Sequence, residues 1–407
     1  MSQMVKLHDL KKTPPPWITY PETKKVLETL RMSGGEGRFV GGCVRDALLG
    51  HISDDIDICT DLKPDAVMTA FGNAGVRVIP TGLKHGTVTA ILGTHKYEIT
   101  TLRVDVSTDG RHAEVEFTAN WQEDAARRDF TINALYLTEE GELLDYFDGI
   151  NDLQAGQLRF IGDADARIEE DRLRVLRYFR FFSRFHRGTP DPDAIAACEN
   201  AVGKLGQLSS ERVTREFMLL LEQRNSTDAL RLMERSGVLQ AVLPGNASLK
   251  LYGKLLELPT SSDALQRLCV LYNGNLEWAK NIATYLRLST RFEARLVLMC
   301  AEDLSLLLST TEQKAELYKL GCEVFKDRVL LAWGRGGHTA ICQSYLELAE
   351  NWQIPKLPVS GKDLLATGMK PGPVVGENLK RLEKDWIASD FLLSKDQLLV
   401  RIGSSNS

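Results

Sequence analysis

The feature that most constrains the fold is a change in hydrophobic periodicity near residue 164. Between residues 39 and 150, short runs rich in β-branched residues alternate with loops and with helix-like stretches such as KPDAVMTAFGNAG. Beyond residue 164, long patterns of helical period replace this alternation, for example EEDRLRVLRYFRFFSRF. Strands gathered in one part of a chain and helices in the rest predict an α+β protein with a small mixed sheet followed by an all-helical region.

The chain has 407 residues, which is longer than most proteins that fold around a single hydrophobic core. We predict four parts. The sheet occupies 1–163, and three helical parts follow at 164–225, 226–355 and 356–407. The proline-rich segment WQIPKLPVSG marks the last joint.

Composition excludes several classes of protein. The seven cysteines are scattered, odd in number and without a Cys-x-x-Cys pair, which argues against a disulfide framework or a zinc site. No apolar run is long enough to span a membrane, and the N-terminal segment lacks the apolar stretch of a secretory signal. We therefore expect a cytoplasmic protein. The net charge of −5 argues against a general nucleic-acid coat but permits a local basic groove.

Two aspartates lie two residues apart in the segment DDIDICT. The β-branched residues around Asp55 and Asp57 favour a strand, and residues two apart on a strand project from the same face. The two carboxylates therefore converge, whereas Asp54 points to the other face. Convergent carboxylate oxygens suit a hard cation such as Mg²⁺, although a solvated acidic strand end gives the same pattern.

The segment GGCVRDALLG precedes this pair. Gly41 and Gly42 allow a ligand to approach the backbone closely, and the amides at the start of the following helix could hold phosphate oxygens. Arg45 adds a planar set of donors for the same phosphates. With the aspartates, these features predict a nucleoside triphosphate bound through two metal ions. Glu98, in KYEITTLRVD, is a candidate third carboxylate, and it also fits an ordinary surface position on a strand.

The segment EDAARRDFTINAL holds a second group of candidates. Arg128 can contact a triphosphate, while Asp129 and Asn133 lie one helical turn apart and can bind a ribose hydroxyl. The alternative is structural, with Asp129 capping a helix whose first turn is FTINAL.

The segment RIEEDRLRVLRYFRFFSRFHR contains seven arginines. On a continuous helix, Asp171 and Arg174 are three residues apart, and Arg177 and Arg180 continue along much the same side. An ordinary surface ion pair is the structural alternative. However, the segment becomes basic beyond Asp171 with aromatic residues interleaved, and an Asp beside an Arg can present acceptors and donors to a base edge. We favour nucleotide binding.

Five segments together resemble the ordered motifs of class II nucleotidyltransferases, the group of tRNA CCA-adding enzymes and bacterial poly(A) polymerases. They are FVGGCVRDALLG with DDIDICT, then RRDFTINAL, DYFDGINDLQAGQLRFIGD, EEDRLRVLRYFRF and SSERVTREF. The resemblance is close over residues 38–225, and residues 360–386 resemble the helical tail element of bacterial members. Among these groups the chain is most similar to a bacterial CCA-adding enzyme.

The resemblance implies a catalytic nucleotidyltransferase head at 1–163, a base-selecting neck, a helical body and a tail that contacts tRNA. It also implies roles for single residues, from metal binding to recognition of the base. In this resemblance Asp55 and Asp57 hold Mg²⁺, and Gly42 and Arg45 touch the triphosphate. Phosphate and ribose are served by Arg128, Asp129 and Asn133. The base edge is met by Asp171 and Arg174, while Arg177 and Arg180 support them and the phosphates. A structural role is implied for Glu211, Arg212 and Glu216.

The implied reaction is addition of C, C and A to the 3′ end of tRNA from CTP and ATP, with the acceptor arm of the tRNA bound and no protein partner indicated. The segment TDGRHA and the lack of extra basic extensions favour complete CCA addition. The alternatives are a poly(A) polymerase, a partial CC- or A-adding enzyme, or a non-catalytic RNA-binding relative.

Overall fold

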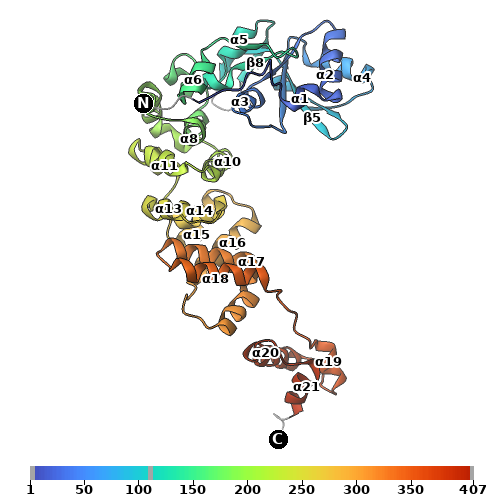
Figure 1. Ribbon diagram of the computed structural model, residues 1–407, viewed down its shortest axis with the longest axis vertical. Coiled ribbons are helices and arrows are strands. Elements are labelled where there is room, and N and C mark those ends of the chain that lie inside the picture. The colour runs from blue at the N-terminus through green and yellow to red at the C-terminus, as the bar shows by residue number, and fades with distance from the viewer. Residues whose placement is uncertain (1–4, 109–112, 404–407) are drawn as a thin grey trace. The chain divides into compact units, whose positions relative to one another are not determined.

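The computed structural model describes residues 5–108 and 113–403, and the chain divides into two compact units, Met1–Pro244 and Gly245–Ser407. The first unit contains the sheet and the helices that follow it, and the second is helical throughout its described residues (Figure 1). The expected α+β class is confirmed. The finer division into four parts stays a prediction.

A seven-stranded sheet forms the centre of the first unit, in the order β3-β4-β5-β2-β1-β8-β9. The sheet is mixed, because β2 and β5 are parallel and the other neighbours are antiparallel. The strands are β1 (Gly37–Val40), β2 (Ile56–Thr60), β3 (Arg77–Gly82), β4 (Thr87–Leu92), β5 (His95–Thr101), β8 (Leu135–Leu137) and β9 (Leu143–Asp145).

Two strands of this sheet were not expected from the sequence. β3 contains Pro80 and a register shift against β4, so its alternation is weak. The segment FTINAL was expected to start a helix, but it forms a single 3₁₀ turn, η2 (Thr131–Asn133), followed by β8. β8 pairs with β1 on one side and β9 on the other, and its three side chains are fully buried. Tertiary pairing therefore overrides the local helical pattern.

A separate two-stranded hairpin, β6 (Arg103–Thr108) with β7 (Ala113–Phe117), follows β5. This stretch carries the segment TDGRHA, which favoured complete CCA addition. Residues 109–112, which fall within that segment, lie outside the described residues.

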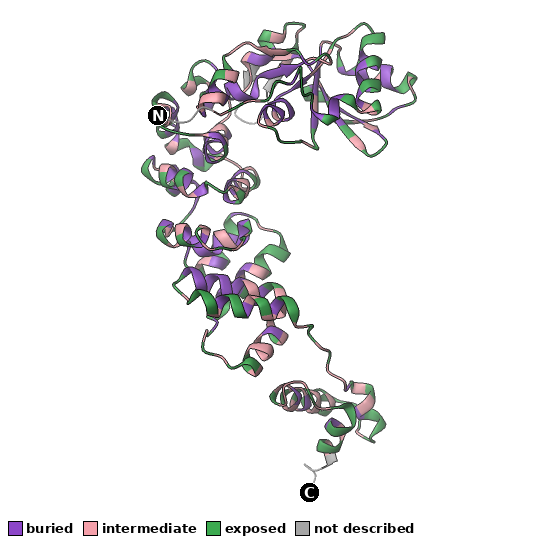
Figure 2. Cartoon of the chain, viewed as in Figure 1, coloured by how far each residue is buried: buried purple, intermediate pink, exposed green. Residues whose placement is uncertain are grey.

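Helices cover the sheet and complete the first unit. They are α1 (Pro16–Thr19), α2 (Pro21–Met32), α3 (Gly42–Leu48), α4 (Pro64–Asn73), η1 (Leu83–His85), α5 (Trp121–Ala126), α6 (Gly149–Ala155), α7 (Ala164–Glu170), α8 (Leu173–Phe185), α9 (Pro192–Asn200), η3 (Val202–Gln207), α10 (Ser210–Glu222), α11 (Ser226–Arg235) and α12 (Val238–Val242). Helix α8 packs on α10 and α11 and buries its aromatic face, including Tyr178 and Phe179. Figure 2 shows buried residues concentrated in the sheet and on the inward sides of the helices.

The long helix expected around residues 168–185 is interrupted. Helix α7 ends at Glu170, Asp171 has extended dihedral angles (φ −152°, ψ 102°), and α8 begins at Leu173. The Asp171 side chain accepts a hydrogen bond from the Leu173 amide (3.1 Å), as capping residues do at a helix start. The expectation that Asp171 and Arg174 share one helix was therefore wrong.

The second unit consists of helices within its described residues. They are α13 (Leu249–Leu256), α14 (Ala264–Leu271), α15 (Leu276–Tyr285), α16 (Thr290–Ala301), α17 (Thr310–Gly334), α18 (Thr339–Asn351), α19 (Gly361–Ala366), α20 (Pro373–Ala388) and α21 (Lys395–Gly403). The last three enclose a small core that includes Leu364, Leu382 and Trp386. No helix in the described part of the chain is long and apolar enough to cross a membrane.

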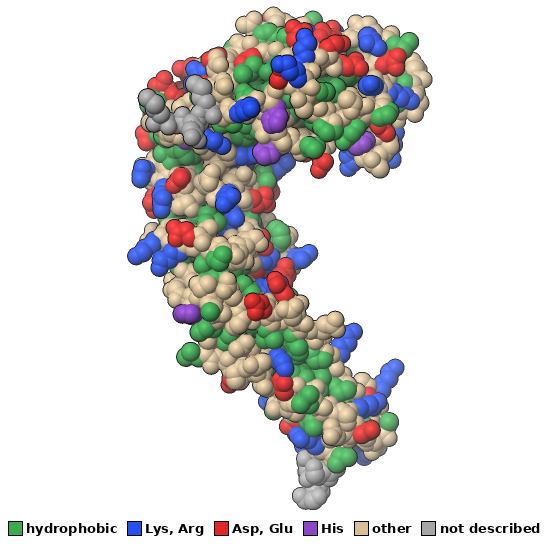
Figure 3. All heavy atoms as spheres, in the orientation of Figure 1, with side chains coloured by type: hydrophobic (Ala, Val, Ile, Leu, Met, Phe, Trp, Pro, Cys, Tyr) green, Lys and Arg blue, Asp and Glu red, His purple; other side chains and the backbone are tan. Residues whose placement is uncertain are grey.

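Charged side chains of both signs are scattered over the face shown in Figure 3. This agrees with the modest net charge of −5. A local concentration of arginines lies in a cavity of the first unit.

Candidate active site

A cavity of about 670 Å³ opens in the first unit between the sheet and the helices that follow it. It brings together every residue that the sequence proposed for nucleotide or metal binding except Glu98. The proposed residues lining it are Gly42, Arg45, Asp55, Asp57, Arg128, Asp129, Asn133, Asp171, Arg174, Arg177 and Arg180. Seven arginines and five aspartates line the cavity in all, a formal excess of positive charge that suits a polyanionic ligand.

The two aspartates of DDIDICT lie at the start of β2. Asp55 immediately precedes the strand, Asp57 lies within it, and both side chains line the cavity. Burial raises the pKa of Asp57 to about 6, the nearby Glu98 and Asp55 carboxylates add to the effect, and Arg128 opposes it. Carboxylates that repel one another in this way are the arrangement that a bound divalent cation stabilises.

Glu98 lies beside this pair but does not line the cavity. It faces Asp57 in the register of the parallel strands β2 and β5, and its side chain is exposed. Among the residues that the structure describes, no three His, Cys, Asp or Glu side chains form a group that could hold a metal ion. Of the three carboxylates at this edge of the sheet, Asp55 and Asp57 line the cavity.

The paired glycines turn the chain from β1 into α3. Gly41 has a positive φ of 71°, which favours glycine, and a Cβ there would lie 3.5 Å from the Arg128 guanidinium. One turn later, Arg45 is almost completely buried. It donates to the carboxylate of Asp46 (2.9 Å) and to the side-chain oxygen of Asn133.

A continuous chain of polar contacts runs from Arg45 to the helices that follow the sheet. Asn133 donates to one oxygen of Asp129 (2.9 Å), and Arg177 of α8 contacts the other (2.7 Å). Burial opposes ionisation of Asp129, but Arg177 and Asn133 outweigh it and lower its pKa to about 2. Asp129 and Asn133 were expected to lie close together because they would be one turn apart on an α-helix. They do lie close together, although no α-helix forms here.

Glu216 on α10 extends this chain. Arg180 donates to its carboxylate (2.6 Å), and Arg177 lies 3.7 Å from it. The side chain of Glu216 is only 8% exposed. Its position agrees with the structural role expected for SSERVTREF, because it joins α10 to two arginines of α8.

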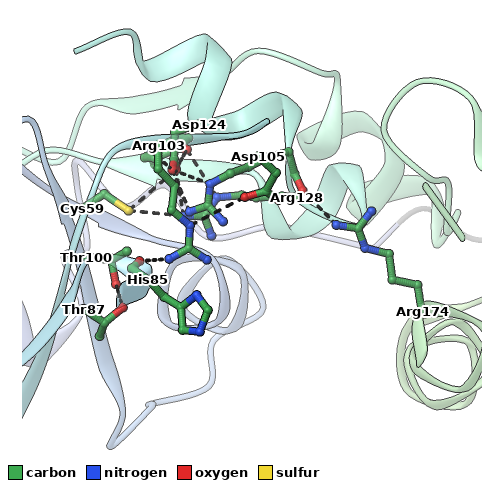
Figure 4. A network of polar contacts seen from close by, with 11 residues as sticks. Cys59, His85, Thr87, Thr100, Arg103, Asp105, Asp124, Arg128 and Arg174 are labelled. Atoms are coloured by element: carbon green, nitrogen blue, oxygen red, sulfur yellow. Dashed lines mark hydrogen bonds and ion pairs between the residues drawn. The ribbon is translucent and has the colours of Figure 1, made fainter. Parts of the chain in front are cut away.

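A second network fixes Arg128 (Figure 4). The fully buried Asp124 on α5 accepts from Arg128 (3.1 Å) and from the Tyr136 hydroxyl (2.8 Å), and its other oxygen pairs with Arg127 (2.7 Å). Burial raises the pKa of Asp124, but the two arginines outweigh it and hold the pKa well below its usual range. Asp124 was not among the residues predicted from the sequence. Its spacing of three and four residues before Arg127 and Arg128 was a usable signal.

The same network reaches the β6–β7 hairpin (Figure 4). The backbone amide of Arg103 donates to Asp124 (3.2 Å), and its guanidinium donates to the carbonyl oxygen of His85. The root of the hairpin is therefore tied to the arginine segment that lines the cavity.

Asp171 and Arg174 also line the cavity, each held by other groups. Arg212 of α10 donates to Asp171 (2.7 Å). Arg174 pairs with Glu170 and donates to the backbone carbonyl oxygens of Arg167 (2.9 Å) and Arg127 (3.1 Å). Sequence reasoning did not foresee that Arg212 lines the cavity.

Comparison with known proteins shows which family this chain belongs to. Three family models match, described as the poly A polymerase head domain (residues 37–159), a probable RNA and SrmB-binding site of polymerase A (189–249) and tRNA nucleotidyltransferase domain 2, putative (256–400). The human mitochondrial CCA tRNA nucleotidyltransferase 1 is 36% identical, with 92% of this chain and 88% of that protein covered. The chain belongs to the family of CCA-adding tRNA nucleotidyltransferases.

Bacterial members of the family are also similar. The CCA-adding enzyme of Latilactobacillus sakei is 31% identical over 93% of this chain and 97% of its own length. The structure of the Bacillus stearothermophilus CCA-adding enzyme in complex with CTP shares the fold with a TM-score of 0.77, at 27% identity over 95% of this chain and 99% of that one. The Thermotoga maritima enzyme complexed with tRNA has a TM-score of 0.67, with 99% of this chain and 100% of that one covered, and at 21% identity it supports the fold alone. The family resemblance expected from the five motifs is confirmed.

Proposed function

We propose that this nucleotidyltransferase adds C, C and A to the 3′ end of tRNA from CTP and ATP and releases pyrophosphate. The observation that carries the proposal is the single cavity that joins an aspartate pair, a set of arginines and an Asp–Arg pair, Asp171 and Arg174. Family membership supports the same reaction, because relatives that match most of the chain are named for CCA addition.

The residues at the start of β2 fit a divalent metal, which we take to be Mg²⁺. Asp55 and Asp57 would hold it, and Glu98 is a further candidate ligand because it faces Asp57 across the parallel strands. When bound, two such ions stabilise the attacking hydroxyl oxygen and the leaving phosphate oxygens in phosphoryl transfer.

The remaining cavity residues would bind and orient the nucleotide. Arg45 and Arg128 present guanidinium groups for the triphosphate, with Gly42 leaving space for it. Asp129 and Asn133 would contact the ribose, and Arg177 with Arg180 would support them and the phosphates. The side chains of the arginines, of Asp129 and of Asn133 are each already held by a protein partner, so little reorganisation is needed when substrate binds.

Base choice would depend on Asp171 and Arg174. The carboxylate accepts and the guanidinium donates, which matches the amino group and ring acceptor on the edges of cytosine and adenine. Uracil and guanine carry a carbonyl oxygen where cytosine and adenine carry the amino group, so the carboxylate of Asp171 would be left without a donor. Discrimination thus follows from hydrogen bonding rather than from cavity size.

Replacing Arg174 by alanine is expected to relax nucleotide choice more than it slows incorporation of the correct nucleotide. Loss of one base contact is worth about 1–3 kcal/mol of discrimination. Steady-state incorporation of each of the four nucleotides into tRNA lacking CCA measures the change. Unchanged preference for CTP and ATP would show that Arg174 is only structural.

The proposed reaction is tested by sizing the products from tRNA lacking CCA with each nucleotide separately and with CTP and ATP together. Addition of exactly two C residues and then one A supports it. A long A tract would identify a poly(A) polymerase, which the name of the first family model makes the second candidate. A product that stops after CC, or A addition only to tRNA ending in CC, would identify a partial enzyme. Binding of tRNA without incorporation would identify a non-catalytic relative.

The four-part organisation also belongs to this proposal. Residues 1–163 would form the catalytic head, 164–225 a base-selecting neck, 226–355 a body, and 356–407 a tail in contact with tRNA. The family models support a boundary after the sheet, since the first ends at residue 159 and the second starts at 189. We also propose that the enzyme acts in the cytoplasm, where its tRNA substrate would be found.

A further inference from the structure

Arg212 of α10 lies at the nucleotide cavity, whereas a residue that only joins helices could lie anywhere in their interface. Its guanidinium lines the nucleotide cavity and donates to Asp171 at 2.7 Å. The two side chains are partly exposed, 33% for Arg212 and 28% for Asp171, so the contact lies at the cavity surface and not in the core. Arg212 therefore reaches into the cavity beside the proposed base-reading residue.

Two donors hold the Asp171 carboxylate, one on each oxygen. The Leu173 amide donates to Oδ1 (3.1 Å) and Arg212 donates to Oδ2 (2.7 Å). Because Asp171 lies in the break between α7 and α8, no helical backbone of its own fixes the side chain. The contact from α10 supplies the second point of attachment, and hydrogen bonds to both oxygens restrict rotation of the carboxylate.

The orientation of the carboxylate decides which lone pairs face the cavity. A carboxylate has about four acceptor positions, and two are used by Leu173 and Arg212. The remaining positions accept from an amino group, such as N4 of cytosine or N6 of adenine, and repel the carbonyl oxygen of uracil or guanine. A carboxylate free to rotate would present its oxygens in many directions, so its selectivity would fall.

We propose that Arg212 is a specificity-positioning residue that acts through Asp171. This inference rests on the proposed function. It assigns to the segment SSERVTREF a role in nucleotide choice beyond the joining of helices. In this proposal Arg212 orients Asp171 and has no direct role at the reacting atoms.

The test replaces Arg212 by methionine, which removes the guanidinium and keeps an unbranched side chain. The ratio of kcat/KM for CTP to that for UTP, on tRNA lacking CCA, is expected to fall about tenfold. Arg212→Lys should recover part of the ratio because one charged donor remains. The matched control is Arg215→Met on the same helix, since Arg215 is exposed and its side chain makes no hydrogen bond or ion pair within the described part of the chain. It should leave the ratio unchanged.

A double-mutant cycle identifies the route of the effect. If Arg212 acts through Asp171, adding Arg212→Met to Asp171→Ala should change the CTP to UTP ratio less than twofold. A ratio that stays at the wild-type value in Arg212→Met, or a full additional loss in the double variant, would overturn the inference. If Arg212→Met does not fold, the same comparison is made with Arg212→Lys, and an unchanged ratio there also overturns it. Wild-type protein that incorporates no C or A would instead contradict the proposed function itself.

Discussion

Asp57→Asn is expected to lower nucleotide incorporation at least about a thousandfold, on the order of 4 kcal/mol in the activation barrier. The substitution keeps the size of the side chain but removes the charge that would hold the metal at the start of β2. Binding of tRNA, measured by filter retention or fluorescence, should remain close to that of the unmodified protein. Asp55→Asn should act in the same direction.

The matched control is Asp54→Asn. Asp54 is the exposed neighbour of the pair and does not line the cavity. Its replacement removes the same charge one residue away and should leave incorporation within about twofold, as surface substitutions usually do. Full activity in both Asp55→Asn and Asp57→Asn would remove the metal assignment.

Asp124→Ala is expected to lower the free energy of unfolding by about 3–5 kcal/mol, because it leaves the buried charges of Arg127 and Arg128 without their partner. Urea denaturation followed by circular dichroism measures the loss. Glu140→Ala, which removes an exposed carboxylate from a turn, should change stability by less than about 0.5 kcal/mol. Equal stability of the two variants would contradict the role given to Asp124.

The same network predicts a pH dependence. The pKa of Asp124 is lowered on folding, so its contribution to stability is complete above the pKa of an unfolded aspartate, about 3.9, and is lost as the pH falls below that value. The difference in stability between the unmodified protein and Asp124→Ala should therefore shrink on acidification from pH 5 towards pH 2.

Local sequence patterns were sufficient to predict the site residues whose positions depend on their own strand or helix. The alternation around Asp55 and Asp57 and the glycine pair with Arg45 predicted strand β2, helix α3 and a shared site, and the cavity contains all of these residues. Their chemical roles stay predictions. The α+β class followed from the same kind of pattern and is confirmed.

Contacts between segments far apart in the chain could not be predicted from the sequence. Glu216 pairs with Arg180, 36 residues earlier, and Arg212 pairs with Asp171, 41 residues earlier. Both contacts depend on how α8 and α10 pack. The strand β8 was mistaken for a helix because its burial between β1 and β9 is a property of the whole sheet. The break at Asp171 was missed because the periodicity continues across it.

The chain of polar contacts from Arg45 to Glu216 determines which truncated fragments of the protein keep their buried charges paired. A fragment that ends at residue 163 would retain the buried Asp129 but lose Arg177, its cationic partner. The sheet on its own would therefore carry an unmatched charge at its own ligand-binding surface. A fragment meant to preserve the catalytic half should extend to about residue 244, where the first compact unit ends.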